Sequence, residues 1–553
     1  MGSQIGFEKL ASVSWYYVAS LLIIGLYFKF NRFWSIRNLD LILIVLLAPG
    51  ALMVTHGQKL RSEYYDAHVE QMADFRMPAD DARQTSIADP SGSLLANPES
   101  ANQENQAPPR DSKSPDSKGE PDSQGEKKSS SNQSSPVRER VDRAELLVEL
   151  RQQRPADSPF MEDPEFAFNV RLERNGYLWL FGFGLLLLIR ILLDPGFRRR
   201  PMLESNLSVG GLVFLGCSML AFVIIDVAQS QPVSDSTDGA RHMVKMVNRE
   251  AVDGEEGEIY YQHGPGFALM HIFPAIPTFV SASGEFKVPE SDSDEAGSGR
   301  QLEITTKILA IISLLGIVAG IVLIGYWHFG NFHLGVTVAT LYLMLPFTAD
   351  TAGLVFHVLP ALLIVWAIVI YKRPYLSGFL IGLAAGVFYY PLFLLPLWFS
   401  FYWERGRVRF LLGFLVSVLL VIGSLVFVSR DFAHFTYHLQ RIFGFWLPKV
   451  VGVRGVWAVG WDPWFRLPLL AGFFGLSFSF ALWPIRKDLG VLISCTAAVM
   501  MALQFCHGFG GGMYIAWYLP LFLLTVFRPS LEDRVAINDI NEKWFIKNLT
   551  ATK

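Results

Sequence analysis

RPYLSGFLIGLAAGVFYYPLFLLPLWFSFYWERGR, residues 373–407, decides the fold, because no charged side chain lies between Pro374 and Trp403. One helix of about 30 residues would span about 45 Å, whereas the hydrocarbon core of a bilayer is about 30 Å thick. Both ends of the run are basic, and short basic loops prefer the cytoplasmic side. We therefore predict a hairpin of two short helices that breaks at residues 389–391, where Pro391 lacks an amide donor, and then returns.

The composition is typical of an integral membrane protein. Hydrophobic residues make up 51% of the 553 residues and aromatic residues 14%, and several charge-free stretches are long enough to cross a bilayer. The three cysteines all lie in apolar runs, so no disulfide framework is predicted. We predict an all-α, polytopic bundle with juxtamembrane helices, located in a bacterial inner (cytoplasmic) membrane.

Eleven full spans are predicted in addition to the hairpin at residues 375–403. They cover residues 11–28, 39–56, 176–193, 206–226, 306–326, 334–349, 353–371, 410–428, 467–485, 489–506 and 513–527. The basic clusters then fall on one side of the membrane: Lys29, Arg32 and Arg37; Arg190 with residues 198–200; Lys372 and Arg373; residues 405–409; Arg486 and Lys487; Arg528 and Arg534. This distribution predicts an outside N-terminus and a cytoplasmic C-terminal tail.

The chain is predicted to have three parts. They are an N-terminal transmembrane helix pair at 1–56, an extracytoplasmic loop at 57–175, and a main transmembrane domain at 176–553 with outer loops 227–305 and 430–466 and a short cytoplasmic tail. The first loop has no aromatic residue from Arg76 to Pro159, so it cannot bury enough apolar surface to offset chain entropy. We predict disorder over about 76–137, followed by an amphipathic helix at 138–151.

Carboxylates at outer helix ends are the first candidates for chemistry. Asp226 ends the span FVIID, and Asp238 follows in DSTDGARHMVKMVNREA. The apolar residues Ala240, Met243 and Met246 of this second segment predict a short interfacial helix. A solvated carboxylate at a helix end is the alternative interpretation of both aspartates, because an Asp at the interface costs far less than one at the bilayer centre.

An apolar segment, YYQHGPGFALMHIFPAIPTFV at residues 260–280, is interrupted by glycines and prolines. It is predicted to be a membrane-surface helix or a re-entrant piece. His263 and His271 have no third ligand at metal spacing, so no metal site is predicted. Glu63 and Asp66 in SEYYDAH are secondary acidic candidates, with the start of a polar loop as the alternative interpretation.

The loop at 430–466 departs from the charge rule. It lies outside by parity, yet it carries Arg430, Arg441, Lys449, Arg454 and Arg466 against Asp431 and Asp462. Basic groups kept on the disfavoured side indicate either binding of an anionic phosphate, for which arginine offers bidentate contact, or binding of lipid headgroups. His434 and His438 would share one face if this part is helical, and the glycine-rich segment 507–512 is predicted to be a flexible turn.

Residues 206–528 resemble the membrane-embedded C-type (GT-C) glycosyltransferases, particularly the polyprenyl-phosphate-sugar-dependent, mannosyl- and arabinosyltransferase-like members. The matching features are an Asp near an outer helix end, the juxtamembrane segment YYQHGPGFALMHIFPAIP, the turn LPFTAD, the hairpin after Arg373, and the late outer loop HLQRIFGFWLPKVVGVRGVW. The resemblance implies an inverting transferase that takes a sugar from a lipid-phosphate donor on the extracytoplasmic face, without a cofactor.

The resemblance also implies roles for particular residues. Asp226 or Asp238 would take the proton of the acceptor hydroxyl, and Arg441 and Arg454 would hold the donor phosphate. The substrate would be contacted by His263, Tyr390 and Trp457. The expected partners are the donor and membrane lipids, with no nucleic acid.

Two alternative functions remain open at this point. A transporter or flippase is disfavoured because charged residues are nearly absent from the predicted spans and inverted repeats are not visible. A non-catalytic assembly factor would use the loop at 76–159 to recruit partners.

Overall fold

The computed structural model describes residues 12–73, 154–196, 203, 205–232, 234–250, 263–279, 295–443 and 453–540. The chain divides into two compact units, one of residues 61–153 and one of residues 1–60 with 154–553. We call the larger unit the main bundle and describe it by itself. Its described residues form helices and no strand, so the all-α prediction is confirmed.

The principal helices follow one another along the chain without an intervening strand in the described residues. They are α1 (Ser12–Tyr27), η1 (Phe30–Arg32), α2 (Ile36–Val45), α3 (Leu47–Ala73), α6 (Pro164–Leu192), η4 (Asp194–Gly196), α7 (Val209–Gln229), α8 (Ser234–Asn248), α10 (Pro265–Met270), α11 (Ile272–Phe279), α12 (Glu295–Leu323), α13 (Phe332–Met344), α14 (Pro346–Thr351), α15 (Val355–Val369), α16 (Pro374–Val387), η6 (Tyr390–Leu394), α17 (Leu395–Phe401), α18 (Arg407–Ser424), η7 (Leu425–Val428), α19 (Phe432–Phe443), α20 (Val456–Val459), α21 (Arg466–Leu482), α22 (Leu489–Ala502), η10 (Ile515–Trp517), α23 (Leu519–Phe527) and α24 (Ala536–Asp539).

Long apolar helices mark the chain as a membrane protein. By length and composition, six helices of the described residues can cross a membrane: Ile36–His68, Pro164–Gly196, Val209–Gln229, Gly299–His328, Arg407–Val428 and Pro463–Leu482. A helix lies in each of the eleven predicted spans. The helices outside the six just named are shorter, so the count of eleven stays a prediction.

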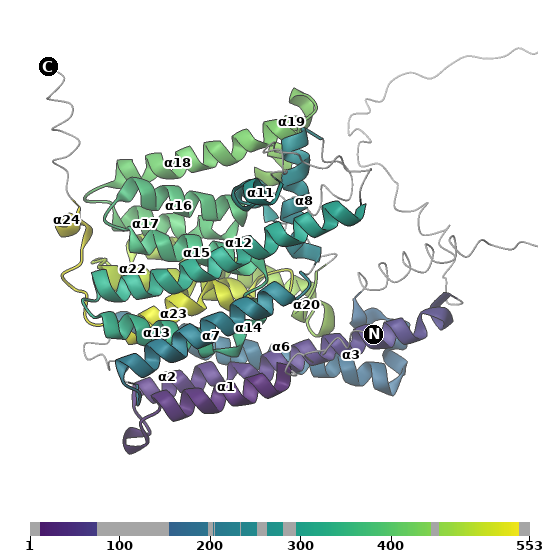
Figure 1. Ribbon diagram of the computed structural model, residues 1–553, viewed down its shortest axis with the longest axis horizontal. Helices are drawn as coiled ribbons and strands as arrows, with labels where there is room; N and C mark the ends of the chain where they lie inside the picture. Colours follow the sequence, from purple (N-terminus) through teal and green to yellow (C-terminus); the bar gives the residue numbers. More distant parts are fainter. Residues whose placement is uncertain are drawn as a thin grey trace, which may run out of the picture. The chain divides into compact units, whose positions relative to one another are not determined.

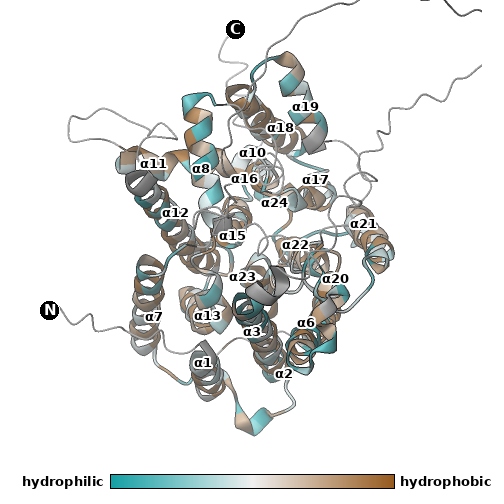
Figure 2. Ribbon diagram, turned by 90° about the vertical axis from the view of Figure 1, so that its right-hand side faces the viewer, coloured by the Kyte–Doolittle hydropathy of each residue, from teal (hydrophilic) through white to brown (hydrophobic). Residues whose placement is uncertain are grey.

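Three short apolar helices lie inside the main bundle. α15, α22 and α23 occupy its middle in the end-on view of Figure 2, and every residue of α22 and α23 is buried. Their surroundings are other helices, so these elements are apolar all round, as expected for buried helices.

The hairpin has the predicted course. α16 ends at Val387, an extended residue follows, and η6 begins at Tyr390 within the predicted break. The chain then returns, because the Tyr402 hydroxyl donates a hydrogen bond of 2.6 Å to the carbonyl of Tyr371, which lies just before α16. α16 packs along α18, where a Cβ on Gly378 would overlap the carbonyl oxygen of Phe410.

The juxtamembrane helix around Asp238 is also present. α8 buries Ala240, Met243 and Met246, the three residues expected to form its apolar face. The next segment forms α10 and α11, and α10 lies against the hairpin: a Cβ on Gly266 would come within 2.6 Å of the carbonyl carbon of Gly386. The outer segment and the end of α16 therefore meet.

The predicted borders of the first loop fall within helices. α3 continues to Ala73 and α6 begins at Pro164, so both helices extend past residues 57 and 175. The predicted disordered stretch and the amphipathic helix at 138–151 lie outside the described residues. The division into three parts stays a prediction.

The two ends of the main bundle differ in chemistry. η1, α24 and the turn at residues 402–406 lie at the end that we call the basic end (Figure 1). α8, α11 and α19 lie at the opposite end, which we call the histidine end because His242, His263 and His438 are buried there.

Candidate functional site

The centre of the histidine end is a cluster of rings, which we call the ring cluster. The ring centroid of His507 lies 5.0 Å from that of Tyr390, 4.3 Å from that of Tyr514 and 5.9 Å from that of Trp517. These residues come from the loop after α22, the hairpin break and η10. The break of the hairpin therefore delivers Tyr390 to rings that are more than a hundred residues distant in sequence.

The ring cluster extends toward α8 through two further histidines. The ring of His357 lies 4.7 Å from that of Tyr514. The ring of His263 lies 5.7 Å from that of Phe388, which in turn lies 5.9 Å from Tyr390. A continuous path of ring contacts thus leads from the start of α10 to the loop after α22.

The late outer loop packs on the other side of the ring cluster. The indole Nε1 of Trp457 donates a hydrogen bond of 2.8 Å to the carbonyl of His507, and the amide of Arg454 donates one of 2.9 Å to that of Gly508. Gly455 has φ of +72° and a Cβ there would lie 2.8 Å from the Cα of Gly510, so both positions require glycine. The side chain of Trp457 is buried and that of Arg454 is exposed.

Arg466, the first residue of α21, supplies a cation next to the ring cluster. Its Nε donates a hydrogen bond of 2.7 Å to the carbonyl of Cys506, and a Cβ on Gly508 would lie 3.0 Å from the guanidinium. Burial, with a smaller contribution from the charge of Arg466, lowers the pKa of His507 to about 3 against the opposing effect of its hydrogen bond to the Phe509 carbonyl. The imidazole is therefore neutral beside a permanent cation.

Asp238 lies on α8, which packs against α10: a Cβ on the neighbouring Gly239 would lie 2.6 Å from the ring of Phe267. The carboxylate of Asp238 is buried and accepts a hydrogen bond of 2.9 Å from Nη1 of Arg241. One turn later, burial lowers the pKa of His242 to about 3, and the nearby charges of Lys245 and of other basic groups, His263 among them, act in the same direction. α8 thus carries a buried carboxylate and a neutral imidazole on adjacent turns.

The remaining candidates lie elsewhere. The side chain of Asp226, near the end of α7, is exposed, which agrees with the interpretation as a solvated helix-end group. Glu63 and Asp66 are exposed on the part of α3 that belongs to the other unit. Arg441 lies in α19, but its side chain is outside the described residues.

The structure therefore unites some of the predicted site residues and separates others. His263, Tyr390 and Trp457 belong to one contact network, which the backbone amide of Arg454 joins at Gly508. Asp238 lies on α8, which packs against α10 beyond the His263 end of this network. Among the described residues no group of three His, Cys, Asp or Glu side chains is placed to hold a metal ion.

A buried glutamate next to the late loop was not among the candidates. Glu173 on α6 is 1% exposed and accepts a hydrogen bond of 3.2 Å from Nε2 of Gln58, which also donates one of 3.1 Å to the Tyr177 hydroxyl. That hydroxyl is 3.3 Å from where a Cβ of Gly455 would lie. The sequence pattern placed Glu173 in a loop that ended at residue 175, whereas α6 begins at Pro164.

His357 and Tyr514 were missed for a different reason. His357 is the single ionisable residue inside an apolar helix, a signal that the sequence does contain. Tyr514 has no local pattern, and Arg466 was noted only as one of five basic residues in the loop at 430–466; the tertiary contacts with His507 bring both into the site.

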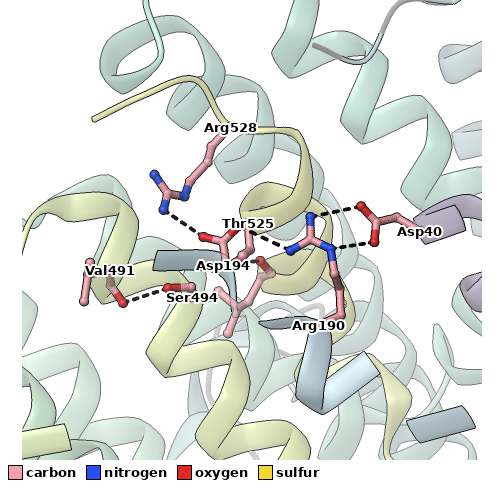
Figure 3. A network of polar contacts seen from close by, with 8 residues as sticks. Asp40, Arg190, Asp194, Val491, Ser494, Thr525 and Arg528 are labelled. Atoms are coloured by element: carbon pink, nitrogen blue, oxygen red, sulfur yellow. Dashed lines mark hydrogen bonds and ion pairs between the residues drawn. The ribbon is translucent and has the colours of Figure 1, made fainter. Parts of the chain in front are cut away.

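The basic end holds a second buried polar group, drawn in Figure 3. Arg190 donates two hydrogen bonds to Asp40, of 2.9 and 3.1 Å, and its Nη1 lies 3.6 Å from Oδ1 of Asp194. Arg528 donates a hydrogen bond of 2.8 Å to the other oxygen of Asp194. Arg190 and Arg528 were counted as basic loop residues, but in the structure both are partners of buried carboxylates.

No family model, no curated protein and no solved structure matches the chain.

Proposed function

We propose that the protein transfers a sugar from a polyprenyl-phosphate-linked donor to an acceptor on the extracytoplasmic face of a bacterial inner membrane. The observation that carries the proposal is the meeting of three chemistries at one end of the bundle. Asp238 offers a proton acceptor, the ring cluster offers a surface of aromatic and neutral polar groups, and Arg454 and Arg466 offer cations.

The ring cluster suits a sugar better than an ion. Pockets for small neutral molecules are lined mainly by aromatic and apolar groups with a few polar atoms. Tyr390, Tyr514 and Arg466 are its partly exposed members, so they form the surface that a substrate can reach. Trp457 and Trp517 lie behind them and are buried.

Asp238 is the better of the two proposed bases. The acceptor hydroxyl loses its proton to a carboxylate while its oxygen attacks the anomeric carbon and the bond from that carbon to the phosphate oxygen breaks. This single displacement inverts the anomeric centre. The carboxylate of Asp238 is buried one turn before His242, whose pKa is affected by the charge of His263, whereas the carboxylate of Asp226 is exposed on α7.

The leaving group gains negative charge on its phosphate oxygen, and a cation near it lowers the barrier. The guanidinium of Arg466 packs on Gly508 beside His507, whereas Arg454 contacts the same glycine through its backbone amide. We therefore propose Arg466 together with Arg454 as the phosphate-facing pair.

The direct test uses the purified full-length protein in proteoliposomes with a panel of polyprenyl-phosphate sugars and candidate acceptors. Mass spectrometry should detect free polyprenyl phosphate and a glycosylated acceptor in equal amounts. Movement of intact lipid-linked sugar to the other leaflet would instead identify a flippase. If no member of a broad panel is consumed or moved, the proposal should be abandoned for an assembly factor.

The orientation needs its own test, since the proposal requires the histidine end to face outward. In a Cys217→Ser background, Ser114→Cys should react with an impermeant reagent on intact cells and Ser530→Cys should not. The reverse labelling pattern would place the ring cluster in the cytoplasm.

A further inference from the structure

The basic end carries a hollow that the proposed function does not use. It has a volume of about 670 Å³ and is lined by Trp403, Glu404, Gly406, Arg407, Val408, Arg409 and Ile537. These residues form the turn between α17 and α18, the first turn of α18 and one residue of α24. We propose that this hollow binds the phosphate headgroup of an anionic membrane phospholipid whose acyl chains lie along α18.

The first argument is charge. Residues 404–409 contain three arginines and one glutamate. Arg405 is used within the protein, because its Nη1 donates hydrogen bonds of 2.7 and 3.1 Å to the carbonyls of Ile537 and Ile540. Arg407 and Arg409 line the hollow together with Glu404, so two of its three charged lining residues are cationic.

The second argument is the position of these arginines on the helix. α18 starts after Gly406, which has φ of +97° and makes no side-chain cap, and the first turn has no acidic residue. Cations at a helix N-terminus oppose the helix dipole, whereas an anion there is stabilised by it and by the unpaired amide groups. An anionic phosphate in the hollow would lie at this helix start beside the cation of Arg407.

The third argument is the apolar surface that continues from the hollow. One face of α18 exposes a row of aliphatic side chains at helical spacing: Val408, Leu411, Leu412, Leu415, Val416, Leu419 and Leu420. The opposite face packs on α16, where Gly378 and Gly413 allow close approach of the two backbones. The exposed row therefore faces lipid and starts at the hollow. Such an apolar surface fits the acyl chains of a phospholipid, whereas a soluble phosphate would not need it.

Trp403 fits the same ligand. Its ring is 55% exposed and the guanidinium carbon of Arg407 lies 4.9 Å from its centroid. Tryptophan is enriched at the level of lipid headgroups, and a stacked guanidinium is held in a fixed orientation for a phosphate. Basic pockets on the cytoplasmic side of helices are typical sites for anionic headgroups.

Native mass spectrometry of the full-length protein with equal amounts of phosphatidylglycerol and phosphatidylcholine tests the inference. The wild type should retain phosphatidylglycerol at least about 10-fold better than phosphatidylcholine. The double variant Arg407→Gln/Arg409→Gln should lose this preference. Arg407→Lys/Arg409→Lys, which keeps the charge and so guards against misfolding, should retain part of it. Arg486→Gln, an exposed arginine in another loop of the basic end, is the matched control and should retain all of it.

Two further arms separate a lipid from a free phosphate. Leu415→Gln, on the apolar row, should weaken retention of long-chain phosphatidylglycerol, and millimolar inorganic phosphate should not displace the lipid. Equal retention of both lipids by the wild type, wild-type behaviour of the double glutamine variant, or full displacement by inorganic phosphate would each overturn the inference.

Discussion

The two ends of the main bundle bury polar groups in opposite ways. At the basic end, Asp40, Arg190, Asp194 and Arg528 are charged and each charge meets an opposite one within 3.6 Å. At the histidine end, several buried polar groups are imidazoles, and the ring of His507 lies against those of Tyr390 and Tyr514. Paired charges fix how helices pack at the basic end, whereas contacts between uncharged rings bring the elements together at the histidine end.

Two buried imidazole atoms of the histidine end, Nε2 of His271 and Nδ1 of His357, have no hydrogen-bond partner among the described residues. Nδ1 of His328 at the basic end shares this property. Native proteins satisfy most buried polar atoms, and an exception calls for an explanation such as a ligand or a water molecule. Burial of polar groups therefore serves packing at the basic end and, in our proposal, binding at the histidine end.

The largest expected effect lies at the histidine end. Asp238→Asn keeps the shape of α8 but removes the proton acceptor, so sugar transfer should slow by roughly 10²–10⁴-fold while donor binding and thermal stability stay close to those of the wild type. Turnover and donor binding are measured on the same preparation. Glu532→Gln, an exposed acidic residue at the basic end, is the control and should be fully active.

A different result for Asp238→Asn would assign the role of proton acceptor to another carboxylate. If Asp238→Asn transfers sugar at the wild-type rate, Asp238 is not the base. Glu173→Gln then becomes the decisive variant, because Glu173 is the buried carboxylate beside the late loop. Asp226→Asn should be near wild type in either case.

The next largest effect is expected from unpairing a charge at the basic end. Asp194→Ala leaves the buried Arg528 and part of Arg190 without their counter-charge, which should lower the free energy of unfolding by about 3–5 kcal/mol. Thermal unfolding in detergent measures this loss of stability. The specific activity of the folded fraction should be retained, and a variant as stable as the wild type would refute the packing role of this network.

A smaller effect concerns the hairpin that joins the two ends. A Cβ on Gly413 would overlap the carbonyl oxygen of Tyr375, so Gly413→Ala should force α16 and α18 apart and cost about 1–3 kcal/mol of unfolding free energy. Gly423→Ala on the same helix meets nothing within 4 Å and should be neutral or slightly stabilising. Equal stability of the two variants would contradict the close packing of the hairpin.

The smallest effect, counted per pH unit, is the acid sensitivity of the histidine end. His242 and His507 have a pKa lowered to about 3 in the folded protein, so between about pH 6.5 and 3 only the unfolded chain binds protons there. The free energy of unfolding should therefore fall as pH decreases below about 6.5, by about 1 kcal/mol per pH unit for each histidine. His242→Gln should flatten the profile between about pH 7 and 5, and an unchanged slope would show that His242 is not buried as a neutral group.

Much of the fold is visible in the sequence. The charge-free run after Arg373, being too long for one span and basic at both ends, predicted the hairpin and its break at residues 389–391. The spacing of Ala240, Met243 and Met246 predicted α8. Membrane chains allow this because each segment must satisfy its own backbone hydrogen bonds, so apolar length and local breaks specify the elements.

Only part of the candidate site could be predicted from the sequence. His263, Tyr390 and Trp457 were chosen from their segments and do share one network, whereas Arg466 and Tyr514 enter it only through contacts with His507. Glu173 was missed because the start of α6 lies in polar sequence before the apolar stretch. Polarity identifies where a helix enters the membrane better than where it begins.

Hydropathy and charge along the chain were enough to establish an all-α membrane protein, the positions of its long apolar helices and the break of the hairpin. Which charges are paired and which rings meet was decided by the packing of the helices. Arg190 and Arg528 look like loop cations in sequence, but the packing of α2, α6 and the end of α23 makes them partners of Asp40 and Asp194. This division arises because hydropathy and helix breaks are local properties of a segment, whereas an ion pair or a ring contact depends on the relative placement of segments that can be hundreds of residues apart.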